Sequence, residues 1–234
     1  MYTYAIGLDI GITSVGWATL ALDEKENPFT ILGMGSRIFD AAEQPKTGAS
    51  LATPRREARS ARRRLRRHRH RNERIRALLI SSGLLSEAEL ATLFEGKLED
   101  VYLLRVLALD KPVTRSELAR ILIHLSQRRG FRSNRKSAVD NEDGKLLEAV
   151  NENKRRMQEA GYRTAGEMML RDPTFFNCKR NKGGNYLSTV TRDMTADEVH
   201  KIFTAQRRFG SEFAGEDFEN AYLEILLSQR SFDD

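Results

Sequence analysis

The sequence has few of the residues that would indicate a secreted or membrane protein. Its 234 residues include one cysteine, five prolines and one tryptophan. Because the single Cys178 cannot form an internal disulfide, the chain is expected in a reducing, cytoplasmic setting. No apolar run approaches the roughly 20 residues of a membrane-spanning helix, and the first residues lack a signal peptide's basic leader. We therefore expect no membrane partner.

Charge, by contrast, is abundant and unevenly distributed. The formal net charge is +6, from 39 basic and 33 acidic residues. Twelve arginines but only two glutamates fall within residues 54–76, so this segment carries +10 and the rest of the chain −4. Positive charge concentrated in this way predicts a polyanionic partner.

The first forty residues are typical of β-strands. Apolar side chains alternate over residues 4–10, and further candidate strands cover 15–22 and 31–39. Three strands cannot bury both faces of a sheet unaided. Trp17 is expected to be a core residue. Residues 44–48 are predicted to form a linker, after which the composition changes sharply.

From Thr53 onward the pattern is helical. Thr53 is predicted to cap a long helix that begins at Pro54 and whose last turn precedes Gly83. The apolar residues of this helix follow a three-four spacing that includes Leu65, Ile75 and Leu79. A last helix is predicted near residues 216–229. The fold class expected from these patterns is α+β.

Three later segments match the capping box, in which a Ser or Thr is followed three residues later by Glu. The pairs are Ser86 with Glu89, Thr114 with Glu117, and Thr195 with Glu198. Each pair predicts the start of a helix.

The arginine-rich helix is poorly suited to stand alone. Like charges four residues apart repel each other on a helix, and Arg55 and Arg56 lie at the unfavourable end of the helix dipole. A nucleic-acid backbone removes this repulsion, and guanidinium groups bind phosphate bidentately. The alternative is a solvated charged face or a localisation signal. The predicted polyanion contacts are Arg55, Arg56, Arg59, Arg62, Arg63, Arg64, Arg66, Arg67, Arg69, Arg71 and Arg74.

Two shorter basic segments are further candidates for RNA contact. The first surrounds Phe131, and its cations are Arg128, Arg129, Arg132, Arg135 and Lys136. The second is a glycine-containing loop with Lys179, Arg180, Lys182 and Tyr186. Basic residues with an interleaved aromatic suit binding to RNA through the backbone and by stacking. A charged helix end and an ordinary surface loop are the respective alternatives.

Asp9 lies within an apolar strand between two glycines, where a carboxylate needs a partner. Nucleases that use two metal ions hold magnesium with such carboxylates, although one carboxylate is not enough. Asp40 and Glu43 are near in sequence, but their spacing does not assign them. Alternatively, Asp9 caps the following turn, or belongs to the phosphate loop of an actin-like ATPase fragment.

The order of three segments, residues 6–17, 59–67 and 124–136, resembles the N-terminal part of a known family. That family is the RNA-guided DNA endonucleases of type II CRISPR systems, particularly the compact subtype. Residues 162–168 and 179–186 are similar to it as well, so the resemblance covers essentially the whole chain.

The resemblance implies three parts. Residues 1–45 would be the first RuvC segment, RNase H-like, with Asp9 as a catalytic carboxylate that binds Mg²⁺, or Mn²⁺, once later segments are present. Residues 46–83 would be a linker and the bridge helix, and residues 84–234 the start of an α-helical recognition lobe. The arginines matching contacts to the guide RNA are Arg59, Arg63, Arg64, Arg67, Arg71 and Arg129.

The family cleaves foreign double-stranded DNA in bacteria and archaea. The implied partners are a guide RNA (crRNA with tracrRNA, or a fused single guide), target DNA and an inhibitor protein. The family's remaining RuvC residues, its HNH nuclease and the domain that reads the adjacent DNA motif have no counterpart in these 234 residues. We therefore expect this chain alone to bind RNA without cutting DNA. A stand-alone RNA-binding or regulatory protein derived from such a nuclease is the alternative.

Overall fold

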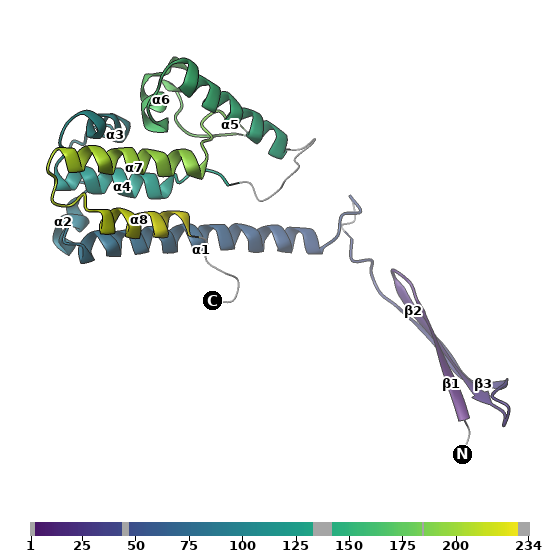
Figure 1. Cartoon of the computed structure of the whole chain (residues 1–234). Coiled ribbons are helices and arrows are strands. Elements are labelled where there is room, and N and C mark those ends of the chain that lie inside the picture. Colours follow the sequence, from purple (N-terminus) through teal and green to yellow (C-terminus); the bar gives the residue numbers. More distant parts are fainter. Residues whose placement is uncertain (1–2, 44–46, 133–141, 184, 229–234) are drawn as a thin grey trace. The chain divides into compact units, whose positions relative to one another are not determined.

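The structure, a computed structural model, describes residues 3–43, 47–132, 142–183 and 185–228 (Figure 1). The chain divides into two compact units, Met1–Arg64 and Leu65–Asp234. The first unit contains a small antiparallel sheet and the second is helical, which confirms the α+β class. No helix in the described part of the chain is both long and apolar enough to cross a bilayer.

The elements follow one another as strands and then helices. The strands are β1 (Thr3–Ile10), β2 (Ser14–Leu22) and β3 (Pro28–Ile38). The helices are α1 (Ala52–Ser81), α2 (Glu87–Thr92), α3 (Val101–Asp110), α4 (Arg115–Gln127), α5 (Glu142–Glu159), α6 (Ala165–Arg171), the 3₁₀ turn η1 (Pro173–Phe175), α7 (Arg192–Arg208) and α8 (Glu216–Leu227). The expected strands and the last helix are confirmed to within a few residues.

The sheet has the order β1-β2-β3 and is antiparallel throughout. The first hairpin closes where the amide of Gly11 donates to the carbonyl of Ser14 at 2.8 Å. In the register of this hairpin, Asp9 lies opposite Gly16. Gly16 therefore places no side chain opposite Asp9, where an added Cβ would lie 3.6 Å from the Asp9 Cβ.

The sheet has no core of its own among the described residues. Large apolar side chains stay exposed on it, among them Leu8 at 63% and Met34 at 64%. The expectation that Trp17 is a core residue is wrong, because its side chain is 44% exposed. Its indole lies against the glycines of β3, where a Cβ added to Gly35 would come within 2.9 Å of the indole nitrogen. The indole therefore covers backbone instead of filling a core.

Helix α1 begins slightly earlier than predicted. The amide of Ala52 donates to the Ser50 hydroxyl at 3.2 Å, so Ser50, not Thr53, supports the first turn. The helix ends before Gly83, whose φ of +74° is easily adopted only by glycine. Its apolar stripe is buried only near the C-terminal end of the helix. Leu79, at that end, is fully buried, whereas Leu65, near the middle, is 70% exposed.

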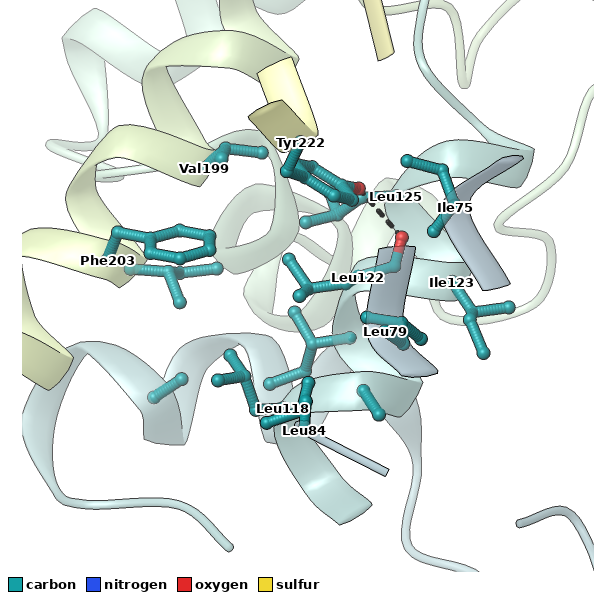
Figure 2. Close-up of a cluster of buried hydrophobic side chains, with 14 of the residues drawn as sticks. Ile75, Leu79, Leu84, Leu118, Leu122, Ile123, Leu125, Val199, Phe203 and Tyr222 are labelled. Carbon is teal, nitrogen blue, oxygen red and sulfur yellow. Dashed lines mark hydrogen bonds between the residues drawn. The ribbon is translucent and has the colours of Figure 1, made fainter. Parts of the chain in front are cut away.

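The end of α1 is packed into the core of the second unit (Figure 2). Ile75 and Leu79 belong to the same buried cluster as apolar side chains of α4, α7 and α8. The buried Tyr222 of α8 donates its hydroxyl proton to the carbonyl of Leu122 at 2.7 Å, which joins α8 to α4. This core fixes α1 through its last two turns and leaves its arginine-rich part outside it.

Two of the three predicted capping boxes are confirmed, those at Ser86 and Thr114. The third is wrong. Helix α7 is capped by Thr191, one turn earlier, and Thr195 and Glu198 are buried inside the helix.

Glu198 instead forms a buried ion pair with Arg105 of α3. The guanidinium meets both carboxylate oxygens, at 2.6 Å from Nε and 2.7 Å from Nη2, and the two side chains are 7% and 0% exposed. The amide of Gly166 donates to the same carboxylate at 2.9 Å. A Cβ at Gly166 would lie 2.5 Å from Glu198, so only glycine lets α6 approach the pair. This pair joins α3, α6 and α7.

The first prediction concerns this pair. Glu198→Ala leaves the Arg105 charge buried and unpaired, so the free energy of unfolding should fall by about 3–5 kcal/mol. Urea denaturation measures the change. Asp197→Ala is the matched control, since its partner Lys201 is 44% exposed and such a pair contributes less than about 1 kcal/mol. Equal losses in the two variants would contradict the assignment.

Candidate nucleic-acid interface

Helix α1 carries a dense exposed surface of arginines. Its first turn contains no acidic residue. Within it, Arg69 pairs with Glu73 at 2.7 Å, in an exposed contact of low expected strength. The exposed arginines are Arg55, Arg56, Arg59, Arg62, Arg63, Arg64, Arg66, Arg69, Arg74 and Arg76, and Arg67 is half-buried. A surface of this charge is suited to the phosphates of a nucleic acid.

Arg71 differs from the other arginines of α1. It is 9% exposed, and its Nε donates to the carbonyl of Ser126 at 2.9 Å. The hydroxyl of Ser126 in turn donates to Asn72 at 2.8 Å. Arg71 therefore anchors α1 to the C-terminal end of α4, and its contact with RNA stays a prediction.

Arg129 and Arg192 extend this positive charge. Nη1 of Arg129 donates to the carbonyls of Leu226 and Ser228, at 3.0 and 2.8 Å, and so caps the end of α8. Burial, followed by the charges of Arg71 and Arg192, lowers the pKa of Arg129 to about 10. Nε and Nη1 of Arg192 are buried without a hydrogen-bond partner in the described structure. Partly buried arginines that repel each other favour a bound anion.

The segment between these arginines is held by backbone hydrogen bonds. The amide of Phe131 donates to Val190 at 2.7 Å, and that of Arg192 donates to Phe131 at 3.0 Å. Gly130 makes this approach possible, since its φ is +84° and a Cβ would lie 2.4 Å from the Thr191 carbonyl. The basic segment after α4 is thus attached to the start of α7.

Beside this segment is a pocket of about 620 Å³. It is lined by residues from several helices and loops of the second unit, including His68, Tyr102, Arg128, Phe131, Arg180 and Tyr186. The predicted RNA contacts at Arg128, Lys179, Arg180 and Tyr186 all line it. Residues distant in sequence therefore form one basic and aromatic site.

Three cations that line this pocket lie close to the ring of Tyr102. The cationic groups of Arg105 and Lys179 lie 5.0 Å from its ring centre, and that of Arg128 lies 5.8 Å away. Nη1 of Arg128 also donates to the Tyr102 hydroxyl at 2.6 Å. Lys179 is paired with Asp100 at 3.1 Å.

His124 is a buried histidine next to cations that line the pocket. Its ring meets the Tyr102 ring edge-on, 4.9 Å between centres. Burial, followed by the charges of Arg105, Arg128 and Arg180, lowers the pKa of His124 to about 2. The imidazole is therefore neutral at physiological pH, and its Nδ1 can accept the contact from Arg105 at 3.4 Å.

Asp9, the candidate metal ligand, lies on the exposed strand β1. Over the described residues there is no group of three or more His, Cys, Asp or Glu side chains that could hold a metal ion. Asp40 and Glu43 are exposed, and Glu43 forms a backbone bridge with Ser50. The side chains described here therefore do not form a metal site by themselves.

Four predicted RNA contacts remain. Arg132 and Lys182 are exposed, while Arg135 and Lys136 lie outside the described residues. The sequence did not indicate Tyr102, Arg105 or Arg192 as part of the basic surface. An arginine in the otherwise apolar α3 was a usable signal for Arg105, because a buried cation needs a partner.

Comparison with known proteins leads to one class, the CRISPR-associated endonucleases. The homologues of this chain are Cas9 endonucleases. The Cas9 of Campylobacter jejuni is 33% identical over 98% of this chain and 24% of its own length. Cas9 1 of Streptococcus thermophilus is 28% identical over 99% of this chain and 20% of its length. No protein-family model matches the chain.

Solved structures of Cas9 proteins are similar to this chain as well. Campylobacter jejuni Cas9 in complex with sgRNA and target DNA matches with a TM-score of 0.71 at 28% identity, covering 97% of this chain and 30% of that one. The St1Cas9–sgRNA–tDNA20–AcrIIA6 assembly matches with a TM-score of 0.66 at 28% identity, covering 98% of this chain and 26% of that one. The chain spans about a quarter or less of the curated relatives it matches.

A second prediction follows from His124. The unfolded imidazole binds a proton below about pH 6.5, whereas the folded one stays neutral down to pH about 2. The unfolded state thus binds more protons in this window, so this group lowers the unfolding free energy by up to about 1.4 kcal/mol for each unit by which the pH is decreased. His124→Gln should make the unfolding free energy less steep between pH 6.5 and 4. Parallel curves for variant and wild type would contradict a buried neutral imidazole.

Proposed function

We propose that this chain is the guide-RNA-binding, N-terminal portion of an RNA-guided DNA endonuclease. The observation that carries the proposal is the exposed arginine surface of α1, on a chain whose homologues are Cas9 endonucleases. Two of the similar structures hold sgRNA and target DNA, which supports the same partners here. The guide RNA would be a crRNA with tracrRNA or a fused single guide.

In this proposal α1 holds the RNA through its backbone. Guanidinium groups bind phosphates whatever the sequence, so the protein selects shape and charge while base pairing reads the target. Arg59, Arg62 and Arg66 are exposed and suited to this contact. The cluster of Arg71, Arg129 and Arg192 adds charge that burial has left partly unpaired.

Asp9 has a separate proposed role. It would supply one carboxylate to a Mg²⁺ or Mn²⁺ site of the RuvC type, completed by carboxylates from other segments of the nuclease. The exposed apolar surface of the sheet supports this, since such a sheet needs further segments to cover it. The metal would stabilise charge on the phosphodiester being cleaved.

The third prediction tests RNA binding by α1. Binding of guide RNA, followed by gel shift over a salt series, should give a log–log slope of about −4 for around six phosphate contacts. Replacing Arg59, Arg62 and Arg66 by Gln removes three of these contacts. The slope should then become shallower by about 2, with weaker binding at every salt concentration.

The control has the same change in net charge at other sites. Lys97, Lys111 and Arg208 are exposed cations that are not part of α1, and their triple replacement by Gln should leave the slope nearly unchanged. A slope near zero for the wild type, or equal effects of the two triple variants, would count against α1 as the RNA-binding element.

The fourth prediction concerns Asp9. Asp9→Ala should leave the RNA affinity of this chain unchanged, because Asp9 lies on β1 and not on α1. In a complex with the further nuclease segments that the proposal requires, the same variant should lose metal-dependent DNA cleavage. Full cleavage by the variant would favour the alternative of a stand-alone RNA-binding protein.

A further inference from the structure

The pocket at Tyr102 has no role in the backbone contacts proposed for α1. We propose that it binds one unstacked nucleotide, with the phosphate at Arg128 and Arg180 and the base against Phe131 or Tyr186. The chemistry is that of a nucleoside monophosphate, either free or as one residue of an RNA chain. The second case rests on the proposed function and gives it a specific subsite.

The size of the pocket suits this ligand. Its volume of about 620 Å³ lies within the range of about 300–1,000 Å³ typical of small-molecule sites. The lining comes from α1, α3, the end of α4 with the segment after it, α5, α6 and the loop before α7. A pocket whose lining is held by several helices of one unit is largely preformed, so little ordering is needed on binding.

The charge of the pocket selects an anion. Its described lining contains Arg105, Arg128, Lys179 and Arg180 and no acidic residue. Arg105 is neutralised by Glu198 and Lys179 is paired with Asp100, which leaves Arg128 and Arg180 as the cations without a carboxylate partner in the described residues. Arg180 is exposed at the rim, and Arg128 is held in place by Tyr102. A phosphate between them would be bound by charge-assisted hydrogen bonds.

The remaining lining suits a base. Phe131 and Tyr186 are half-buried, so each offers part of an aromatic face, and the backbone bonds of Phe131 to the start of α7 fix its position. Gln127 also lines the pocket, with an amide that can both donate and accept. The Asn181 amide is already bonded to Ser188 and Thr189, which makes Gln127 the less committed of the two amides. Stacking with one adaptable amide favours a nucleotide of relaxed base identity.

Calorimetric titration of the whole chain tests the proposal. The probes are UMP, AMP, uridine and inorganic phosphate, and the two nucleotides should bind more tightly than uridine or phosphate. Arg180→Gln removes a charge-assisted bond and should weaken nucleotide binding about tenfold. Tyr186→Ala removes a stacking surface and should weaken it by a similar factor of about ten.

Matched controls lie outside the pocket. Arg208→Gln removes an exposed cation of α7, and Phe176→Ala an aromatic side chain that is 61% exposed. Both should bind nucleotides like the wild type. Unfolding curves of all four variants establish that the fold is kept. Absence of nucleotide binding to the wild type, or binding unchanged by both pocket variants, would overturn the proposal.

Competition identifies the source of the nucleotide. If a short single-stranded RNA displaces UMP, the pocket takes a residue of an RNA chain; if the RNA binds without displacing UMP, it takes a free nucleotide. Either result supports the pocket. RNA binding that depends on Arg59, Arg62 and Arg66 without nucleotide binding would overturn the pocket alone. Nucleotide binding without RNA binding would support the pocket and overturn the proposed function.

Discussion

The repulsion among closely spaced arginines is the constraint on which the rest of this structure depends. On α1 the arginines have few acidic neighbours, and the cluster at Arg129 and Arg192 is partly removed from water. Such an arrangement is costly for an isolated protein, because each guanidinium raises the energy of the next. It becomes favourable when a polyanion supplies the missing charge. The basic surface is therefore better suited to binding a polyanion, as proposed, than to stabilising the free chain.

The interior of the helical unit is stabilised by polar contacts between its helices. The Arg105–Glu198 pair joins three helices, Arg71 attaches α1 to α4, and Tyr222 attaches α8 to α4. Each of these contacts satisfies a polar group within an otherwise apolar core. The basic segment at Gly130 and the pocket at Tyr102 depend on the same helices. Rigid support behind exposed charge would limit the ordering needed in the proposed binding of RNA.

Local features were predictable from the sequence because their partners are close along the chain. The capping boxes at Ser86 and Thr114 are closed by residues three positions later, and the strands follow a period of two. The same rule failed at Thr195, because Glu198 is held by Arg105, 93 residues away. Trp17 was misjudged for a related reason, since a core needs a second layer that the three strands do not supply.

The candidate site was predictable in its charge and not in its geometry. The arginines of α1 and the cations around Phe131 and Arg180 could be named from composition. Their division into an exposed surface, a helix cap at Arg129 and a pocket around Tyr102 depends on contacts between distant segments. The role of Asp9 stays a prediction, because no group of three or more side chains that could hold a metal ion occurs among the described residues.

The exposed apolar sheet should make this polypeptide prone to self-association. β1 and β3 are edge strands whose outer backbone groups are unpaired within the sheet, and they carry exposed apolar residues such as Ile10 and Ile38. Edges of this kind recruit strands from neighbouring molecules and lead to aggregation. Self-association of the purified chain should therefore begin at the sheet, and a lysine placed on β3 is the natural remedy.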